Sequence, residues 1–144
     1  MAATVIVAVR KAVVAAVADL APFTDVPVMY AFKATTNREF AYTRDATFEH
    51  GAAAMKSGRN FRDEVGRFEF VIWVEAPGDS AEEAADRALV FGLAFEEWVA
   101  DNKAGVGGAY AIQVEGGGQI REATGDQSSY AELVYPIKYN ARLT

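Results

Sequence analysis

The chain of 144 residues contains no cysteine and a single histidine, His50. Without cysteine it can form neither a disulfide nor a thiolate metal site, and it has no cysteine nucleophile. This composition is in keeping with a reducing cytoplasm. His50 has no second histidine or cysteine at ligand spacing, and it falls in a polar stretch that predicts a loop. We therefore expect no metal-binding or catalytic role for it.

Long apolar runs are also missing. No segment approaches the roughly 20 apolar residues that a membrane-spanning helix needs. Arg10 and Lys11 follow the first apolar segment, whereas a signal peptide begins with its basic residues. We expect a soluble protein that is not secreted, with one domain over residues 1–144 and a core of its own.

The patterns that carry catalysis are absent as well. Glu82-Glu83 and Glu96-Glu97 are adjacent pairs, which diverge by about 100° on a helix and cannot converge on one substrate atom. The glycine-rich segment 105–108 comes after a helix and before a strand, the reverse of a phosphate-binding loop. We expect no enzymatic activity, no cofactor and no metal.

What the sequence does contain is a strong strand signal at Arg67–Glu75. Phe68, Phe70, Ile72 and Val74 alternate with a second set that carries charges, and this alternation predicts a strand with one buried face. Val71 and Trp73 interrupt the polar set. The second face should therefore be covered in part, by another element or by a neighbouring subunit.

A capped helix is predicted to follow this strand. Ser80 and Glu83 fit a capping box, and Lys103 and Gly105 end the helix in the usual order. Its apolar stripe holds small residues first and aromatic ones later, comprising Ala81, Ala85, Ala88, Leu89, Phe91, Gly92, Phe95, Trp98 and Val99. We expect the small half to lie close on a sheet.

Periodicity elsewhere predicts one more helix and four more strands, over residues 4–20, 26–32, 40–48, 110–124 and 131–143. Pro27 suggests an edge strand, and Pro136 should face an open edge or a bulge. The fold class is therefore α+β: a mainly antiparallel sheet of about five strands with two helices packed on one face, in the order α-β-β-β-α-β-β.

Residues 50–60 contain little apolar bulk and two glycines. This composition predicts a flexible loop within the domain. The segment is either a variable loop without a partner or an arm that docks on one. In the second case, Met55 would supply an adaptable apolar contact and Lys56 and Arg59 charged contacts.

Charge is divided unevenly along the chain, whose formal net charge is −6. Residues 33–67 have seven basic and five acidic side chains, whereas residues 77–132 have three basic and eleven acidic ones. These segments are either ordinary solvated faces or the mark of a polar molecule that stacks with copies of itself or with other partners.

Several of these segments together resemble a known family. The first helix ending before Pro22, the strand Arg67–Val74, the turn and helix start Gly78–Ala88, and the closing strand to Asn140–Leu143 resemble the tail terminator (tail completion) proteins of long-tailed, non-contractile bacteriophages. The resemblance covers almost the whole chain and lies in element order and residue type, without an active-site motif.

This resemblance implies a structural virion protein at the head–tail junction. It would form a homo-oligomeric ring, typically a hexamer, that caps the tail tube and joins the head completion or connector protein. Double-stranded DNA would pass through the lumen without specific binding, which an acidic excess suits. Candidate contacts with other subunits or with the tube are Met55, Lys56, Arg59, Val71 and Trp73.

Two alternatives remain open from the sequence. The first is another component of the same particle, such as a different head-to-tail joining protein or the tail tube protein. The second is a small α+β ligand-binding domain or enzyme with a pocket under the long helix, near Phe91, Phe95 and Trp98. This second alternative requires polar groups beside the aromatic rings.

Overall fold

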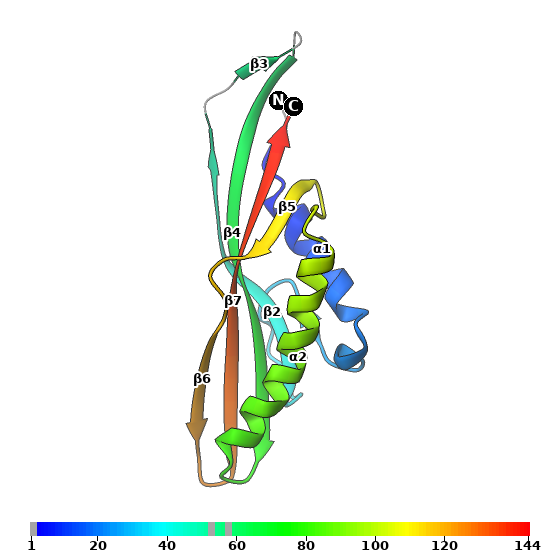
Figure 1. Ribbon diagram of the computed structural model, residues 1–144. Coiled ribbons are helices and arrows are strands. Elements are labelled where there is room, and N and C mark those ends of the chain that lie inside the picture. Colours follow the sequence, from blue (N-terminus) through cyan, green and yellow to red (C-terminus); the bar gives the residue numbers. More distant parts are fainter. Residues whose placement is uncertain (1–2, 52–53, 57–58) are drawn as a thin grey trace.

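The computed structural model of the chain describes residues 3–51, 54–56 and 59–144, and for residues 54–56 and 59–60 the backbone alone. The helices are α1 (Ile6–Ala18), the short 3-10 helix η1 (Ala21–Phe23) and α2 (Ala81–Asp101). The strands are β1 (Val28–Met29), β2 (Glu39–His50), β3 (Ala54–Lys56), β4 (Arg59–Pro77), β5 (Ala109–Val114), β6 (Gln119–Thr124) and β7 (Ser128–Leu143). Figure 1 shows an elongated, twisted sheet with both helices on the same side.

The sheet has the order β1-β2-β4-β7-β5, with β3 paired to β4 and β6 paired to β7. Among the strand pairs that the structure describes, β1 and β2 run parallel and the others are antiparallel. The α+β prediction is therefore confirmed. The sheet has seven strand segments because β3 is added and because the predicted strand 110–124 is divided into β5 and β6.

The division between β5 and β6 lies where the sequence places its glycines. Both strands pair with β7, β6 with its first half and β5 with its second, so they follow one another along one edge. Between them Gly116 and Gly117 have φ of +79° and +97°. Glu115 N donates to Pro136 O at 2.8 Å. The backbone nitrogen and carbonyl oxygen of a strand residue point to the same side. The nitrogen of Pro136, which carries no hydrogen, therefore also faces the break between β5 and β6, as predicted.

The predicted strand 26–32 is mostly wrong, because β1 covers only Val28–Met29. The chain leaves the sheet at Tyr30, whose carbonyl oxygen accepts hydrogen bonds from the Thr43 hydroxyl and from Arg10 Nη2 instead of a neighbouring strand. The Arg10 guanidinium also lies 4.0 Å from the centre of the Tyr30 ring. Hydrogen bonds from side chains thus replace the backbone hydrogen bonds of a neighbouring strand at this edge of the sheet.

β2 and β4 are longer than predicted. β2 includes His50, so the prediction that His50 lies in a loop is wrong. β4 begins at Arg59 and not at Arg67. The two strands pair from Glu39 with Val74 to His50 with Glu64, with one irregularity between Arg44 and Thr47. They carry β3 beyond the helices to one end of the molecule, the upper end in Figure 1.

α2 packs as its sequence predicts in most respects. Ser80 caps it by accepting a hydrogen bond from Glu83 N at 3.2 Å. Gly92 lies so close to the sheet that a Cβ there would be 2.5 Å from the Tyr135 hydroxyl oxygen. Phe95, further along, stacks on Phe70 with ring centres 4.2 Å apart. Ala84 and Ala88 in the first half are also fully buried. Gly92, near the middle of the helix, therefore lies close on the sheet, and Phe95 beyond it fills the core.

A buried carboxylate joins three strands to the start of α1. Glu64 on β4 is fully buried, and its Oε1 accepts hydrogen bonds from the Tyr139 hydroxyl at 2.6 Å and from Val5 N at 3.1 Å. Its Oε2 lies 2.6 Å from His50 Nε2. Arg62 Nη1 lies 3.2 Å from His50 Nδ1. Because arginine can only donate, Nδ1 accepts, and Nε2 carries the hydrogen that His50 donates to Glu64.

These hydrogen bonds determine the ionisation of Glu64. Burial alone would raise the pKa of the carboxyl group, but hydrogen bonds from Tyr139, Thr4, His50 and Val5 hold the pKa below its ordinary value. Burial, with the Glu64 hydrogen bond, raises the pKa of Tyr139. The pair therefore consists of a carboxylate and a neutral phenol at neutral pH.

The lowered pKa of Glu64 predicts how the stability of the fold changes at acidic pH. A carboxyl group whose pKa is lower in the folded chain stabilises the fold above its unfolded value of about 4.3, and this contribution is lost as the pH falls through the folded pKa. We expect the free energy of unfolding, measured in urea, to fall more steeply between about pH 5 and pH 3 in the unmodified protein than in Glu64→Gln. Parallel curves would contradict this assignment.

Candidate interface

The most prominent surface feature is a set of aromatic rings on the sheet face that the helices do not cover, called here the outer face. Five rings from four segments form this aromatic row: Phe32, Phe40, Tyr42, Trp73 and Tyr130. Consecutive members lie within ring contact, with ring centres from 4.5 Å apart for Trp73 and Tyr130 to 6.1 Å apart for Phe40 and Tyr42. Phe32 closes the other end at 5.4 Å from Tyr42 and 5.7 Å from Phe40.

Strand register creates the aromatic row. Cross-strand partners point to the same face, and Phe40, Trp73 and Glu132 are successive partners on β2, β4 and β7. Phe32 is 58% exposed and Tyr130 is 37% exposed. Tyrosine and tryptophan are enriched in protein interfaces, and a contiguous exposed apolar patch indicates a binding surface.

The aromatic row is hollowed at one point. A depression of about 260 Å³ is lined by four of its rings and one carboxylate, namely Phe32, Phe40, Tyr42, Trp73 and Glu132. The strand signal that carries Trp73 is evident in the sequence. Its association with Phe32 and Glu132 is not, because it depends on the pairing of strands far apart in the chain.

Val71 and Trp73 have different positions on this face. Trp73 is half-buried in the aromatic row, whereas Val71 is fully buried between its cross-strand partners Tyr42 and Val134. Cross-strand side chains of the same subunit thus flank Val71. Part of the Trp73 side chain is therefore exposed on the outer face, whereas Val71 is covered by its own chain.

The other predicted contact residues lie at the far end of the sheet. Met55 and Lys56 are on β3, where they pair with Asn60 and Arg59 of β4. Residues 52–53 and 57–58, and the side chains of Met55, Lys56 and Arg59, lie outside the described structure, so the flexible loop stays a prediction. Trp73 follows Arg59 by fourteen positions along β4, about 45 Å at 3.3 Å per residue. The two groups of predicted contact residues therefore lie in different parts of the sheet.

A second apolar surface lies on α2, on the side away from the sheet. Leu89, Val90 and Leu93 are 52%, 47% and 59% exposed. The prediction that Leu89 belongs to the buried stripe is wrong, because the buried residues of the helix are Ala84, Ala88, Phe91, Gly92, Phe95 and Val99. The aromatic row and this α2 patch thus lie on opposite sides of the molecule.

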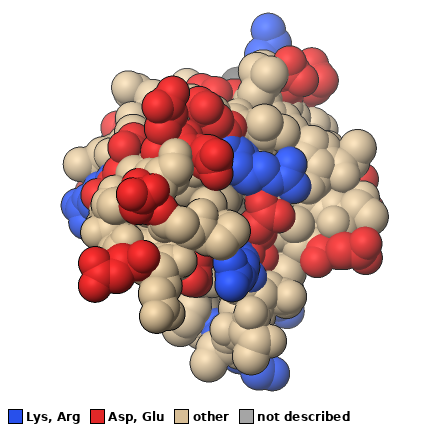
Figure 2. All heavy atoms as spheres, turned by 90° about the horizontal axis from the view of Figure 1, so that it is seen from below, with Lys and Arg blue, Asp and Glu red and all other residues tan. Residues whose placement is uncertain are grey.

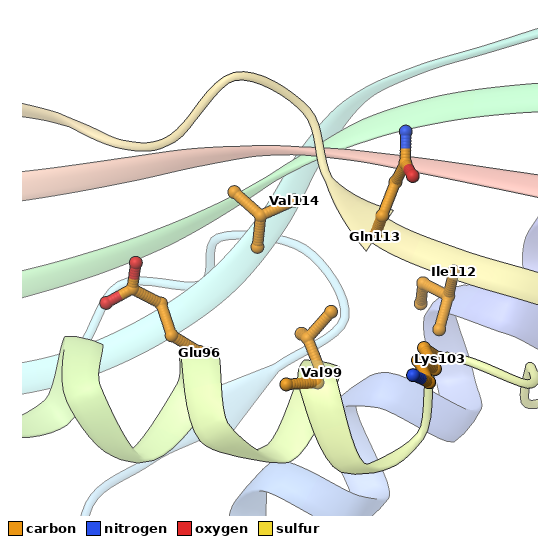
Figure 3. Close-up of a pocket in the computed structure, with 7 residues that line it drawn as sticks. Glu96, Val99, Lys103, Ile112, Gln113 and Val114 are labelled. Carbon is orange, nitrogen blue, oxygen red and sulfur yellow. The ribbon is translucent and has the colours of Figure 1, made fainter.

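A cleft separates the end of α2 from β5, with a volume of about 260 Å³. Figure 3 shows Glu96 and Lys103 at its two ends, with Val99 and Val114 between them and Ile112 beside Lys103. Charged groups that stand apart over an apolar floor do not form an acid–base pair. The pocket expected under α2 is filled, because Phe91 and Phe95 are buried against Phe23, Phe70 and Tyr135.

Acidic side chains collect where α2 begins. Figure 2 views this end and shows more acidic than basic groups on it. The first turns of α2 and the β6–β7 turn contribute exposed carboxylates from Asp79, Glu82, Glu83, Asp86 and Asp126. Arg87 is neutralised by Glu39, with Nε and Oε2 2.6 Å apart. This end of the molecule therefore repels polyanions.

Among the residues that the structure describes, no three histidine, aspartate or glutamate side chains are grouped to hold a metal ion. Within the same residues, neither helix combines the length and the apolar composition needed to cross a membrane.

No family model matches the chain, and no curated protein matches it. Among solved structures, a chain in the virion of a native gene transfer agent particle superposes with a TM-score of 0.59. The match covers 97% of this chain and 100% of the other, at 14% sequence identity. The two chains share one fold. At this identity the likeness concerns the fold, and it extends over nearly all of this chain and the whole of the other.

Proposed function

We propose that this protein is a structural virion component, the tail terminator of a phage-like particle. The observation that carries the proposal is the end-to-end fold match with a chain of a gene transfer agent virion. The sequence resemblance to tail terminators is independent of that match and points to the same kind of particle. In this role the protein has no catalytic function and no cofactor.

The surface of the subunit suits a closed ring. A head-to-tail ring needs two different, complementary surfaces on each copy. The aromatic row on the outer face and the α2 patch of Leu89, Val90 and Leu93 are apolar, exposed and on opposite sides. We infer that the row of one copy packs against the α2 patch of the next, six times around the ring.

The ends of the subunit suit contacts along the particle axis. The β2–β4 arm extends beyond the helices and carries Met55, Lys56 and Arg59, which makes it the candidate contact with the tail tube or with the head completion protein. The acidic end bears five exposed carboxylates. Placed toward the lumen, it would let double-stranded DNA pass without the counterion release that drives nonspecific binding.

Light scattering coupled to size exclusion tests the ring. We expect a species with about six times the 15.5 kDa mass of one chain, formed alone at high concentration or with tail tube protein. A protein that stays monomeric under both conditions would contradict the proposal. Filaments of undefined length would favour a tail tube protein instead.

A substitution in the aromatic row should weaken this assembly. Phe32 is 58% exposed, so Phe32→Ala removes an apolar contact at little cost to the fold. We expect association about tenfold weaker, the equivalent of 1.4 kcal/mol for one lost contact. Tyr110, an aromatic residue that is 53% exposed and outside both patches, is the matched control, and Tyr110→Ala should associate normally. Equal effects of the two changes would exclude the aromatic row from the ring contact.

A further inference from the structure

Most of the strands at the border of the sheet are protected from pairing with a strand of another protein. β1 has only two residues, and β2 carries an irregularity at Asp45, whose φ is +53°. The loop after α2 covers β5, where Ile112 N donates to Lys103 O at 3.2 Å. Short strands, bulges and covering loops are common means of such protection, and in the described structure β6 has none of them. Its six residues pair with β7 in one unbroken register.

β6 presents a row of backbone groups at the border of the sheet. Gly125 N donates to Ser128 O at 2.9 Å, and this bond fixes the alternation of the β6–β7 ladder. The N–H and C=O groups of Ile120, Glu122 and Thr124 therefore point away from β7, toward the open side of β6 in Figure 1. Within the described part of the chain, no other backbone group bonds to them.

The side chains of β6 differ between its two faces. On the outer face, Arg121 stands opposite Glu132 of β7, so the charges there are balanced. On the helix side lie Ile120, which is 38% exposed, and Glu122, and their cross-strand partners on β7 are both apolar. The helix side of β6 therefore carries one exposed apolar side chain and one carboxylate.

Neither α2 nor the facing part of β7 balances the charge of Glu122 in the described structure. α2 contains one basic residue, Arg87, which pairs with Glu39 at 2.6 Å. The acidic end of the molecule, formed by the first turns of α2 and the β6–β7 turn, adds further negative charge. A strand that pairs with β6 therefore gains from a basic residue opposite Glu122 and an apolar residue opposite Ile120.

A second copy of this chain does not meet that requirement. Its other border strands are protected, so it offers β6 alone. Two copies of β6 that pair across a two-fold axis keep their outer faces together, and facing residues then lie on the same face. The two central registers therefore set Arg121 opposite Arg121 or Glu122 opposite Glu122, and like charges directly opposite destabilise a strand pair.

We propose that β6 binds an extended segment of a different protein, which pairs antiparallel with it and carries a basic residue two positions before an apolar one. In this order the basic side chain lies opposite Glu122 and the apolar one opposite Ile120. Backbone hydrogen bonds supply affinity in this mode of binding, and alternate side chains supply selectivity. The site lies outside the aromatic row and the α2 patch, so it does not depend on ring formation.

Amide hydrogen exchange of the whole chain, followed by nuclear magnetic resonance, tests the open strand. The outward amides of Ile120, Glu122 and Thr124 should exchange at least about tenfold faster than those of Arg121 and Ala123, which bond to β7. The probe is the hexapeptide Thr-Val-Lys-Thr-Val-Thr, capped at both ends, with its lysine opposite Glu122. It should slow the exchange of the outward amides saturably, and the same peptide with glutamate in place of lysine should bind about fivefold more weakly.

Thr124→Pro and Thr124→Val are a matched pair of variants. Proline removes the outward N–H of this residue and none of the bonds to β7, whereas valine keeps the N–H. Thr124→Pro should weaken peptide binding at least about tenfold while the amides of Arg121 and Ala123 stay protected, and Thr124→Val should bind normally. Glu122→Gln should remove most of the preference for the lysine peptide. A peptide N-methylated at its second valine repeats the test without a change in the protein.

The following results would overturn the proposal. Outward amides that exchange as slowly as their neighbours at low protein concentration would show that the chain itself covers β6. Slower exchange at higher protein concentration, without peptide, would show that a second copy covers it. Equal binding of the lysine and glutamate peptides, equal binding by Thr124→Pro and Thr124→Val, or no peptide binding would reject strand recognition.

The light-scattering experiment on the ring reports separately. A ring that forms without peptide binding rejects the proposal for β6 alone. Peptide binding by a permanent monomer rejects the ring alone.

Discussion

Glu64→Ala is expected to lower the free energy of unfolding by about 4 kcal/mol, a large part of the 5–15 kcal/mol typical of a domain. The carboxylate is fully buried and accepts hydrogen bonds from the Tyr139 hydroxyl and Val5 N. Alanine leaves the buried Tyr139 hydroxyl and the partly buried Val5 N without this acceptor, at about 1–3 kcal/mol each, and adds a cavity. Urea denaturation at neutral pH measures the loss.

The control for this change is the neighbouring residue of the same strand. Asp63 pairs with Arg142 on the surface, where its side chain is 52% exposed. Exposed pairs contribute at most about 1 kcal/mol, so Asp63→Ala should have a small effect. If the two variants lost the same stability, Glu64 would not be the connection between β2, β4, β7 and α1 that the hydrogen bonds indicate.

Gly107→Ala is expected to cost about 3 kcal/mol, the sum of overpacking and backbone strain. Gly107 has φ of +61°, and a Cβ there would lie 2.6 Å from Ala8 O and 2.8 Å from Val9 Cα. Both contacts are with the backbone of α1, which cannot move aside as a side chain can. The loop between α2 and β5 would have to separate from α1.

Gly116→Ala separates the effect of overpacking from the effect of backbone strain. Gly116 also has a positive φ, +79°, but a Cβ there meets nothing within 4 Å. Its substitution should show backbone strain alone, about 1–2 kcal/mol. Thermal or urea unfolding of both variants gives the comparison. A cost for Gly107→Ala no greater than that for Gly116→Ala would mean that α1 and this loop are not in close contact.

The sequence predicts those parts of the fold in which one strand or helix carries its own apolar pattern. Residues 67–75 alternate clearly because their inner face packs on α2. Residues 59–66 belong to the same strand but lack the pattern, because Gly66 and Glu64 occupy inner positions. The Tyr139 ring takes the space that a side chain at Gly66 would fill, and the Tyr139 hydroxyl binds Glu64. Contacts between residues 75 positions apart are not visible in local periodicity.

The candidate interface was predictable only in part for the same reason. Trp73 is conspicuous in the sequence because it breaks a polar face. Phe32, Phe40 and Tyr130 look like ordinary apolar residues until the pairing of β2, β4 and β7 brings them beside it. Leu89 fits a helical stripe by spacing, but it lies on the side of α2 away from the sheet, and its side chain is 52% exposed.

The proposed role of the protein is to close the end of a tail tube. Tubes assembled from purified tail tube protein, incubated with this chain and imaged by negative-stain electron microscopy, test it most directly. We expect ring-shaped density at one end of each tube and tubes that no longer lengthen when more tube protein is added. Protein distributed along the tubes, or tubes that keep growing with bare ends, would contradict the claim.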